Sequence, residues 1–113
     1  MEKLKIESTS GEGILVIQLN GTIDHHTVRG IREKIDSDIY RSRAKEIVLD
    51  LSGVEFMDSS GLGLILGRYT KITDLGGHLT LREVSDEIMK IIKLSGVDKF
   101  IPCEKTKLKG CRK

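Results

Sequence analysis

The sequence predicts an α/β fold, in which a mainly parallel β-sheet and its packed helices form a single domain. Segments with the apolar pattern of strands alternate with helical patterns of ten or more residues. Such alternation implies crossover connections between parallel strands, and these are almost always right-handed. The length of 113 residues allows one hydrophobic core and is too short for two ordinary ones.

The first two strands are predicted at residues 3–8 and 13–19. The second strand begins with the apolar run Ile14 to Ile17, and Gly11-Glu12-Gly13 supplies turn residues before it. We therefore expect these two segments to form a hairpin.

A first helix is predicted after Gly21, with Asp24 as its N-cap. An aspartate suits this place because its carboxylate accepts hydrogen bonds from the free N–H groups of the first turn. Apolar residues then recur at helical spacing, and charged residues fill the other face. The apolar residues are Val28, Ile31, Ile35 and Ile39.

The central strand is predicted at residues 47–51, a nearly continuous apolar run of the kind found in strands covered on both faces. A second helix follows and stops at Gly76-Gly77. Its expected apolar stripe consists of Leu62, Ile65, Leu66, Tyr69 and Ile72.

The last elements follow the same alternation. Residues 78–83 are typical of a strand, Ser85 is the expected N-cap of a third helix, and Gly96 is its expected end. A short final strand is predicted near Phe100 and Ile101.

The segment between the central strand and the second helix is the most informative part of the chain. Gly61, Gly63 and Gly67 lie in or near the start of that helix, where each costs up to about 1 kcal/mol relative to alanine. Close packing on the sheet is the expected reason for Gly67. For Gly61 and Gly63, access of another molecule to the backbone is at least as good an explanation.

The serines of this segment have an ordinary structural explanation and a functional one. Helix capping is the commonest role for Asp58 and Ser59 in this place. A serine hydrolase is not indicated, because a nucleophile elbow needs Gly-x-Ser-x-Gly and the first glycine is missing. No arrangement of base and orienting acid is visible beside Ser60 either, so we expect no enzymatic activity.

Two further patterns bear on ligand binding, the spacing of the glycines and the pair of adjacent histidines. The glycines from Gly61 to Gly67, with Glu83 about 20 positions later, resemble a relaxed dinucleotide fingerprint, which leaves a small nucleotide-binding domain as an alternative function. The match is weak because Gly61 lies ten positions beyond Leu51, where the strand is expected to end. Adjacent His25 and His26 lack the i, i+4 spacing of a helical metal site, so neither a metal nor a cofactor is expected.

Four segments together resemble a known family. Phe56–Gly63 and Ile65–Tyr69 closely resemble the anti-sigma factor antagonists with a STAS domain, in particular members that act in sporulation. Gly21–Thr27 is similar to the family's loop before the first helix, and Leu94–Gly96 to the end of its third helix. The resemblance covers most of residues 3–102.

This resemblance implies a mixed, mostly parallel sheet of four or five strands with helices largely on one side. It also implies a regulatory cycle. The unphosphorylated antagonist binds an anti-sigma factor, which releases its sigma factor and is also a serine kinase that uses ATP. Phosphorylation then switches the antagonist off, and a PP2C-type serine phosphatase restores it. A STAS-like structural module that does not switch is the other alternative.

The same resemblance assigns the site residues. Matching the Asp-Ser-Ser-Gly run position by position places the phosphoacceptor at Ser60. The residues expected to contact the partner are Asp24, His25, Thr27, Asp58, Ser59, Ser60, Gly61 and Gly63.

Charge distribution and hydropathy limit the remaining partners. The segment Lys105–Lys113 holds five of the 19 basic residues and no acid, so the rest of the chain has 14 basic against 17 acidic residues, or −3. We therefore expect residues 1–102 to form the domain and 103–113 a basic tail. Nucleic acid and membrane are not expected partners, and a cytoplasmic protein that is monomeric when free is predicted.

Overall fold

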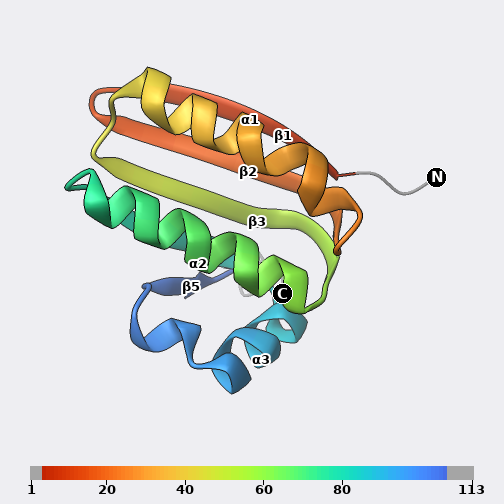
Figure 1. The fold of residues 1–113 in the computed structure, drawn as a ribbon. Coiled ribbons are helices and arrows are strands. Elements are labelled where there is room, and N and C mark those ends of the chain that lie inside the picture. Colours follow the sequence, from red (N-terminus) through yellow and green to blue (C-terminus); the bar gives the residue numbers. More distant parts are fainter. Residues whose placement is uncertain (1–3, 107–113) are drawn as a thin grey trace.

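Five strands form one mixed sheet in the computed structural model, which describes residues 4–106 (Figure 1). The order across the sheet is β1-β2-β3-β4-β5, with β1 antiparallel to β2 and every later pair parallel. The predicted α/β fold with a mainly parallel sheet is therefore confirmed. The strands are β1 (Leu4–Gly11), β2 (Ile14–Ile23), β3 (Glu46–Met57), β4 (His78–Val84) and β5 (Cys103–Lys105).

Three α-helices connect the parallel strands: α1 (Thr27–Ser42), α2 (Ser59–Asp74) and α3 (Asp86–Ser95), the last followed by a short 3₁₀ turn, η1 (Val97–Lys99). Figure 1 shows α1 and α2 side by side over one face of the sheet, with their N-termini at the same end. Right-handed crossovers that all step the same way along a sheet place their helices on one face. The prediction of helices largely on one side is thus confirmed.

The core lies between this helical layer and the sheet. Alternate residues of β2 and β3, such as Ile17 and Leu49, are fully buried, and they pack with Ile35 of α1 and Ile65 of α2. The four apolar residues predicted for the first helix are all buried. Helical and strand periodicities therefore meet in one continuous core.

The opposite face of the central strand differs from the prediction, because it carries polar side chains beside Val48, and α1 and α2 both lie on the other face. Asp50 of β3 accepts a hydrogen bond from Arg82 of β4 (3.2 Å) and another from the backbone N–H of Ser52 (2.9 Å). Burial alone would raise the pKa of Asp50, but these hydrogen bonds outweigh it and hold the pKa below its usual value. This network of hydrogen bonds lies on the second face of the sheet and lets Asp50 be buried there.

The predicted hairpin is confirmed, and both of its strands are longer than expected. Gly11 pairs with Ile14, so the loop has the two residues Glu12 and Gly13, both with positive φ (54° and 82°). Two residues of that kind form the turn whose twist matches a hairpin.

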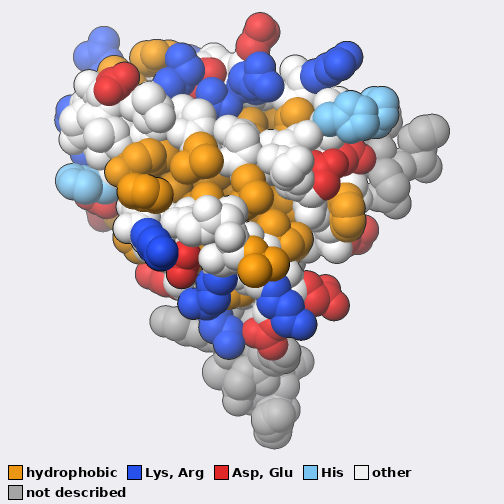
Figure 2. Space-filling view, turned by 60° about the horizontal axis from the view of Figure 1, so that its bottom comes forward, with side chains coloured by type: hydrophobic (Ala, Val, Ile, Leu, Met, Phe, Trp, Pro, Cys, Tyr) orange, Lys and Arg blue, Asp and Glu red, His pale blue; other side chains and the backbone are white. Residues whose placement is uncertain are grey.

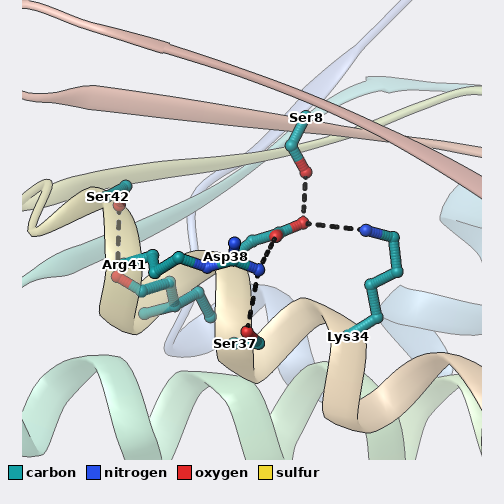
Figure 3. A network of polar contacts seen from close by, with 7 residues as sticks. Ser8, Lys34, Ser37, Asp38, Arg41 and Ser42 are labelled. Carbon is teal, nitrogen blue, oxygen red and sulfur yellow. Dashed lines mark hydrogen bonds and ion pairs between the residues drawn. The ribbon is translucent and has the colours of Figure 1, made fainter.

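A polar network fixes α1 to the edge strand β1 (Figure 3). Asp38 accepts a 2.7 Å hydrogen bond from the Ser8 hydroxyl, and Lys34 and Arg41 lie 4.0 and 3.8 Å from its carboxylate. The hydroxyl of Ser8 reaches from the strand to the helix, while the two cations come from α1 itself. This contact fixes the outer side of α1 to the hairpin.

The predicted apolar stripe of α2 is only partly correct. Ile65 and Ile72 are buried as expected, but Leu66 is 40% exposed, and the buried face instead includes Leu64 and Arg68. Most of the predicted positions therefore lie one residue after the positions that are buried. Figure 2 shows hydrophobic side chains gathered in a patch on one face of the molecule, and the exposed large hydrophobic residues include Leu66, Leu75, Leu94 and Phe100.

The end of the domain differs from the prediction as well. Ser85 caps α3 by accepting a hydrogen bond from Ile88 N–H (3.2 Å), and Gly96 ends the helix with φ of 86°, both as expected. The last strand, however, lies at Cys103–Lys105, because Phe100 and Ile101 belong to the turn that follows η1. The sheet therefore extends beyond residue 102, and most of the predicted basic tail lies outside the described residues.

Removing side-chain volume from the central strand should reduce stability strongly. Leu49 is 0% exposed in β3, whereas Leu94 at the end of α3 is 89% exposed. We expect Leu49→Ala to lower the free energy of unfolding by about 2–5 kcal/mol and Leu94→Ala to change it by less than about 0.5 kcal/mol. Urea unfolding followed by circular dichroism measures both, and equal effects would contradict the placement of the core.

Candidate functional site

The predicted site residues meet at the carboxyl ends of β2 and β3. The last residues of these parallel strands, Ile23 and Met57, are direct partners, and the Asp58 N–H donates to the Ile23 carbonyl (3.1 Å). The loop beginning at Asp24 and the segment beginning at Asp58 therefore start side by side. Binding sites of open α/β sheets tend to form at this edge.

Asp58 is the N-cap of α2. Its carboxylate accepts a 2.8 Å hydrogen bond from the backbone N–H of Ser60, and its backbone is extended. The capping role weighed for Asp58 is confirmed. The capping role favoured for Ser59 is wrong, because Ser59 is already the first residue of the helix and is exposed.

Ser60 stands in the first turn of α2 with its side chain half-buried. Its hydroxyl makes no hydrogen bond to any residue in the range 4–106, whereas its backbone N–H donates to Asp58. This hydroxyl therefore stands at the N-terminus of α2 without a protein partner among the described residues. The positive end of the helix dipole favours negative charge there.

The loop before α1 is held by reciprocal hydrogen bonds between Asp24 and Thr27. The Asp24 carboxylate accepts from the N–H groups of His26 (2.9 Å) and Thr27 (3.0 Å), and the Thr27 hydroxyl accepts from Asp24 N–H (2.9 Å). The hydrogen bond from Thr27 is the main reason that the pKa of Asp24 lies below its usual value. The helix starts at Thr27 with His26 in the N-cap position, so the predicted cap was placed two residues early, although Asp24 supplies the capping oxygen.

His25 and His26 are the exposed residues of this loop, and His25 lines the site. Its ring centroid lies 4.0 Å from that of His26, and its side chain lines a groove shared with Ser60. Asp24 and Thr27 build the loop, while His25 faces the site. The structure therefore brings the predicted residues of the two segments to one surface.

The three glycines of α2 have different surroundings. A Cβ on Gly61 would overlap the side chain of Met57 and lie 3.1 Å from Ile23 Cγ2, so this glycine allows α2 to approach the sheet. A Cβ on Gly63 or Gly67 would meet nothing within 4 Å. Close packing thus explains Gly61 and not Gly67, for which it was predicted. Gly63 is the glycine with an open surface.

An open groove of about 560 Å³ runs between α1 and α2 and is called the α1–α2 groove below. Arg29 and Arg32 of α1 line it, and they were not among the predicted site residues. Their i, i+3 spacing was the available signal, since it places both arginines on one side of α1. The main lining residues are His25, Arg29, Arg32, Ser60, Gly63 and Arg68.

Arg68 is buried, being only 4% exposed, although an arginine in a helix is more often a solvated residue. Its Nε lies 2.8 Å from an oxygen of Asp36 on α1, an ion pair that links the two helices. Burial lowers the pKa of Arg68, Asp36 raises it, and nearby Arg32 lowers it again. The spacing Leu64-Arg68-Ile72 places Arg68 on the buried face of α2.

The described residues give little support to cofactor chemistry. Within residues 4–106, no group of three or more His, Cys, Asp or Glu could hold a metal ion. None of the helices in the same range is long and apolar enough to cross a bilayer. Gly61, Gly63 and Gly67 lie inside α2 and not in a turn between strand and helix, so they do not form a phosphate-binding loop. Glu83 instead accepts a 2.7 Å hydrogen bond from the Thr106 hydroxyl.

These features define a small α/β domain with a serine in the first turn of a helix, and the comparisons identify its family. The chain belongs to the STAS domain family, whose pattern it matches over residues 5–109. It is similar to the anti-sigma F factor antagonist of Paenibacillus polymyxa, with 40% identity over 99 residues, covering 88% of this chain and 85% of the relative.

Solved structures agree with this relationship. The structure of the anti-sigma factor antagonist SpoIIAA in its unphosphorylated form has a TM-score of 0.74 and 32% identity, covering 95% of this chain and 91% of that one. The phosphorylated form of the Bacillus cell fate determinant SpoIIAA has a TM-score of 0.68 and 31% identity, covering 95% of both chains. The predicted resemblance to STAS-domain anti-sigma factor antagonists, including those of sigma F, is confirmed.

Alanine substitutions at two nearby glycines should have opposite effects. Gly61→Ala must displace Met57, at an overpacking cost of about 1–3 kcal/mol that exceeds the gain in helix propensity. Gly63→Ala meets no neighbour and should raise stability by up to about 1 kcal/mol. Urea midpoints measured side by side test this, and a Gly61→Ala protein as stable as Gly63→Ala would contradict the packing described for Gly61.

Proposed function

We propose that this protein is a non-enzymatic anti-sigma factor antagonist whose unphosphorylated form binds an anti-sigma factor serine kinase. The antagonist makes the kinase release its sigma factor, and phosphorylation of Ser60 ends the interaction. In that step the γ-phosphoryl group of ATP is transferred to Ser60 Oγ, the hydroxyl proton is lost and ADP leaves. A PP2C-type serine phosphatase returns the protein to its active form.

The observation that carries this proposal is the hydroxyl of Ser60. It has no hydrogen-bond partner among residues 4–106 and lies where two loops meet, while Asp58 fixes the backbone on which it stands. The structural relatives described as unphosphorylated and phosphorylated SpoIIAA support the assignment, since both share this fold at more than 30% identity.

The proposed partner surface surrounds this serine. His25 and Gly63 are exposed beside it, and Ser59 is the exposed residue at the helix start. Asp24 and Thr27 hold the loop of His25 through their hydrogen bonds, and Asp58 and Gly61 position the first turn of α2. In this proposal the serine receives the phosphoryl group and performs no catalysis, because no described residue makes a hydrogen bond to its hydroxyl.

A phosphate at this place can block binding without unfolding the domain. It adds about −1.5 to −2 charges and three acceptor oxygens, which the N-terminus of α2 tolerates. Inside an interface shaped for a neutral hydroxyl, the same charge costs several kcal/mol through repulsion and desolvation. The switch therefore acts on recognition of the partner.

The proposed setting is the cytoplasm, with the free protein a monomer that binds neither nucleic acid nor membrane.

Phosphorylation tests the switch residue directly. The protein is incubated with ATP and the anti-sigma F factor of Paenibacillus polymyxa, whose antagonist is 40% identical, and intact and peptide masses are measured. We expect a single phosphate on Ser60, its absence in Ser60→Ala, and its retention in the matched variant Ser59→Ala. If the kinase modifies its own antagonist and leaves this chain unmodified, the chain is a STAS module that does not switch, or pairs with another kinase.

A permanent charge should mimic the switched-off state. We expect Ser60→Asp to weaken binding to the kinase by about 100-fold or more, which corresponds to about 2.7 kcal/mol, because the charge enters the interface beside Asp58. Titration calorimetry measures the affinity, and thermal unfolding checks the fold. Weakened binding together with a large fall in melting temperature would argue against a switch that acts on recognition alone.

A further inference from the structure

The α1–α2 groove joins the proposed phosphoacceptor to a group of cations. Ser60 lines it from the first turn of α2, and His25 and Arg29 line it from the start of α1. Because α1 and α2 run in the same direction from the same end of the sheet, their first turns face each other across the groove (Figure 1). A group attached to the Ser60 oxygen would share this groove with these side chains.

The positive charge of this groove is not neutralised by the rest of the domain. Seven ion pairs occur among residues 4–106, and neither Arg29 nor Arg32 takes part in any of them or makes a hydrogen bond there. By contrast, Lys34 and Arg41 on the same helix both lie within 4.0 Å of Asp38. Two neighbouring guanidinium groups without acids are an arrangement suited to a phosphate.

The third arginine lies at the floor of the groove. The side chain of Arg68 is 5% exposed, and its Nη1 is buried without a hydrogen-bond partner. Its Nε is close to Asp36, but the N–H does not point along that contact well enough for a hydrogen bond. Asp36 pairs with Arg68, and Arg29 and Arg32 make no ion pair with any residue in the range 4–106.

Two small residues keep the groove open. Gly63 and Gly67 lie on the side of α2 that faces it, and a side chain on either would enter free space. The glycines that did not serve helix–sheet packing therefore make room between the helices. Space, positive charge and the serine hydroxyl all occur in the same place.

We propose that the phosphate on Ser60 binds back into the α1–α2 groove, where Arg29 is its main contact and Arg32 and His25 complete the site. The inference rests on the proposed function in that Ser60 is the phosphoacceptor. It adds that the phosphorylated form is an internally paired state, with the new charge held by the domain's own arginines. Phosphorylation then both removes a neutral contact from the partner surface and occupies His25 and Arg29.

The charges around the phosphate make its titration a specific readout. Two carboxylates, Asp58 and Asp24, would raise the second pKa of the phosphate. The cations and the helix terminus would lower it, and these are His25, Arg29, Arg32, buried Arg68 and the α2 N-terminus. Asp36 offsets part of the charge of Arg68. A free phosphoserine has its second pKa near 6. The contribution of Arg29 is isolated by comparing variants that share every other charge.

The experiment uses the full chain with phosphoserine installed at position 60 during translation, so that no kinase is needed. The pH titration of its phosphorus-31 resonance is measured for the wild type, Arg29→Gln, Arg32→Gln and Arg41→Gln. Arg41→Gln is the matched control, with the same change of charge on the same helix but outside the groove. The chain unfolded in urea gives the reference pKa.

We expect the folded wild type to titrate below the unfolded chain. Arg29→Gln should raise the pKa by about half a unit or more, Arg32→Gln by less, and Arg41→Gln by a negligible amount. Circular dichroism confirms that each variant is folded. A titration unchanged by Arg29→Gln, or changed equally by Arg41→Gln, overturns the inference whatever the kinase does. Failure of the kinase assay with an intact Arg29 effect would instead overturn the proposed function alone.

Discussion

The parallel register between β2 and β3 determines where the site lies. Because Ile23 pairs with Met57, the two strands end together, and the hydrogen bond from Asp58 to the Ile23 carbonyl joins the segments that follow. A shift of this register would separate His25 from Ser60 and turn alternate side chains of the central strand away from the core. The hydrophobic pattern that buries Leu49 therefore also positions the serine.

The parts of the fold that were predicted correctly from the sequence depend on local patterns. The alternation of strand and helix patterns, the Val28-Ile31-Ile35-Ile39 stripe and the cap at Ser85 depend on neighbours in the chain, and the structure confirms them. The predictions that failed depend on distant partners. Arg68 is buried because Asp36 of another helix faces it, and the last strand begins only where the chain after η1 reaches β4. Local patterns contain neither contact.

The candidate site divides in the same way. The segment from Asp58 to Gly63 was identified from its residues, because structural roles alone do not readily explain two serines and two glycines at the start of a helix. The separate reasons for the glycines became visible only in three dimensions, where Gly61 meets Met57 and Gly63 faces the groove. Arg29 and Arg32 were missed because their significance depends on which helix face lies opposite them.

The position of these arginines on α1 has an evolutionary consequence. Val28 and Ile31 point into the core, and Arg29 and Arg32 follow each of them by one position, so they lie at the margin of the packed face. Exchanging either arginine for a neutral residue leaves the packing of the helix intact. If the proposed phosphate site exists, such an exchange would loosen the hold on the phosphate and shorten the switched-off state without any change to the core.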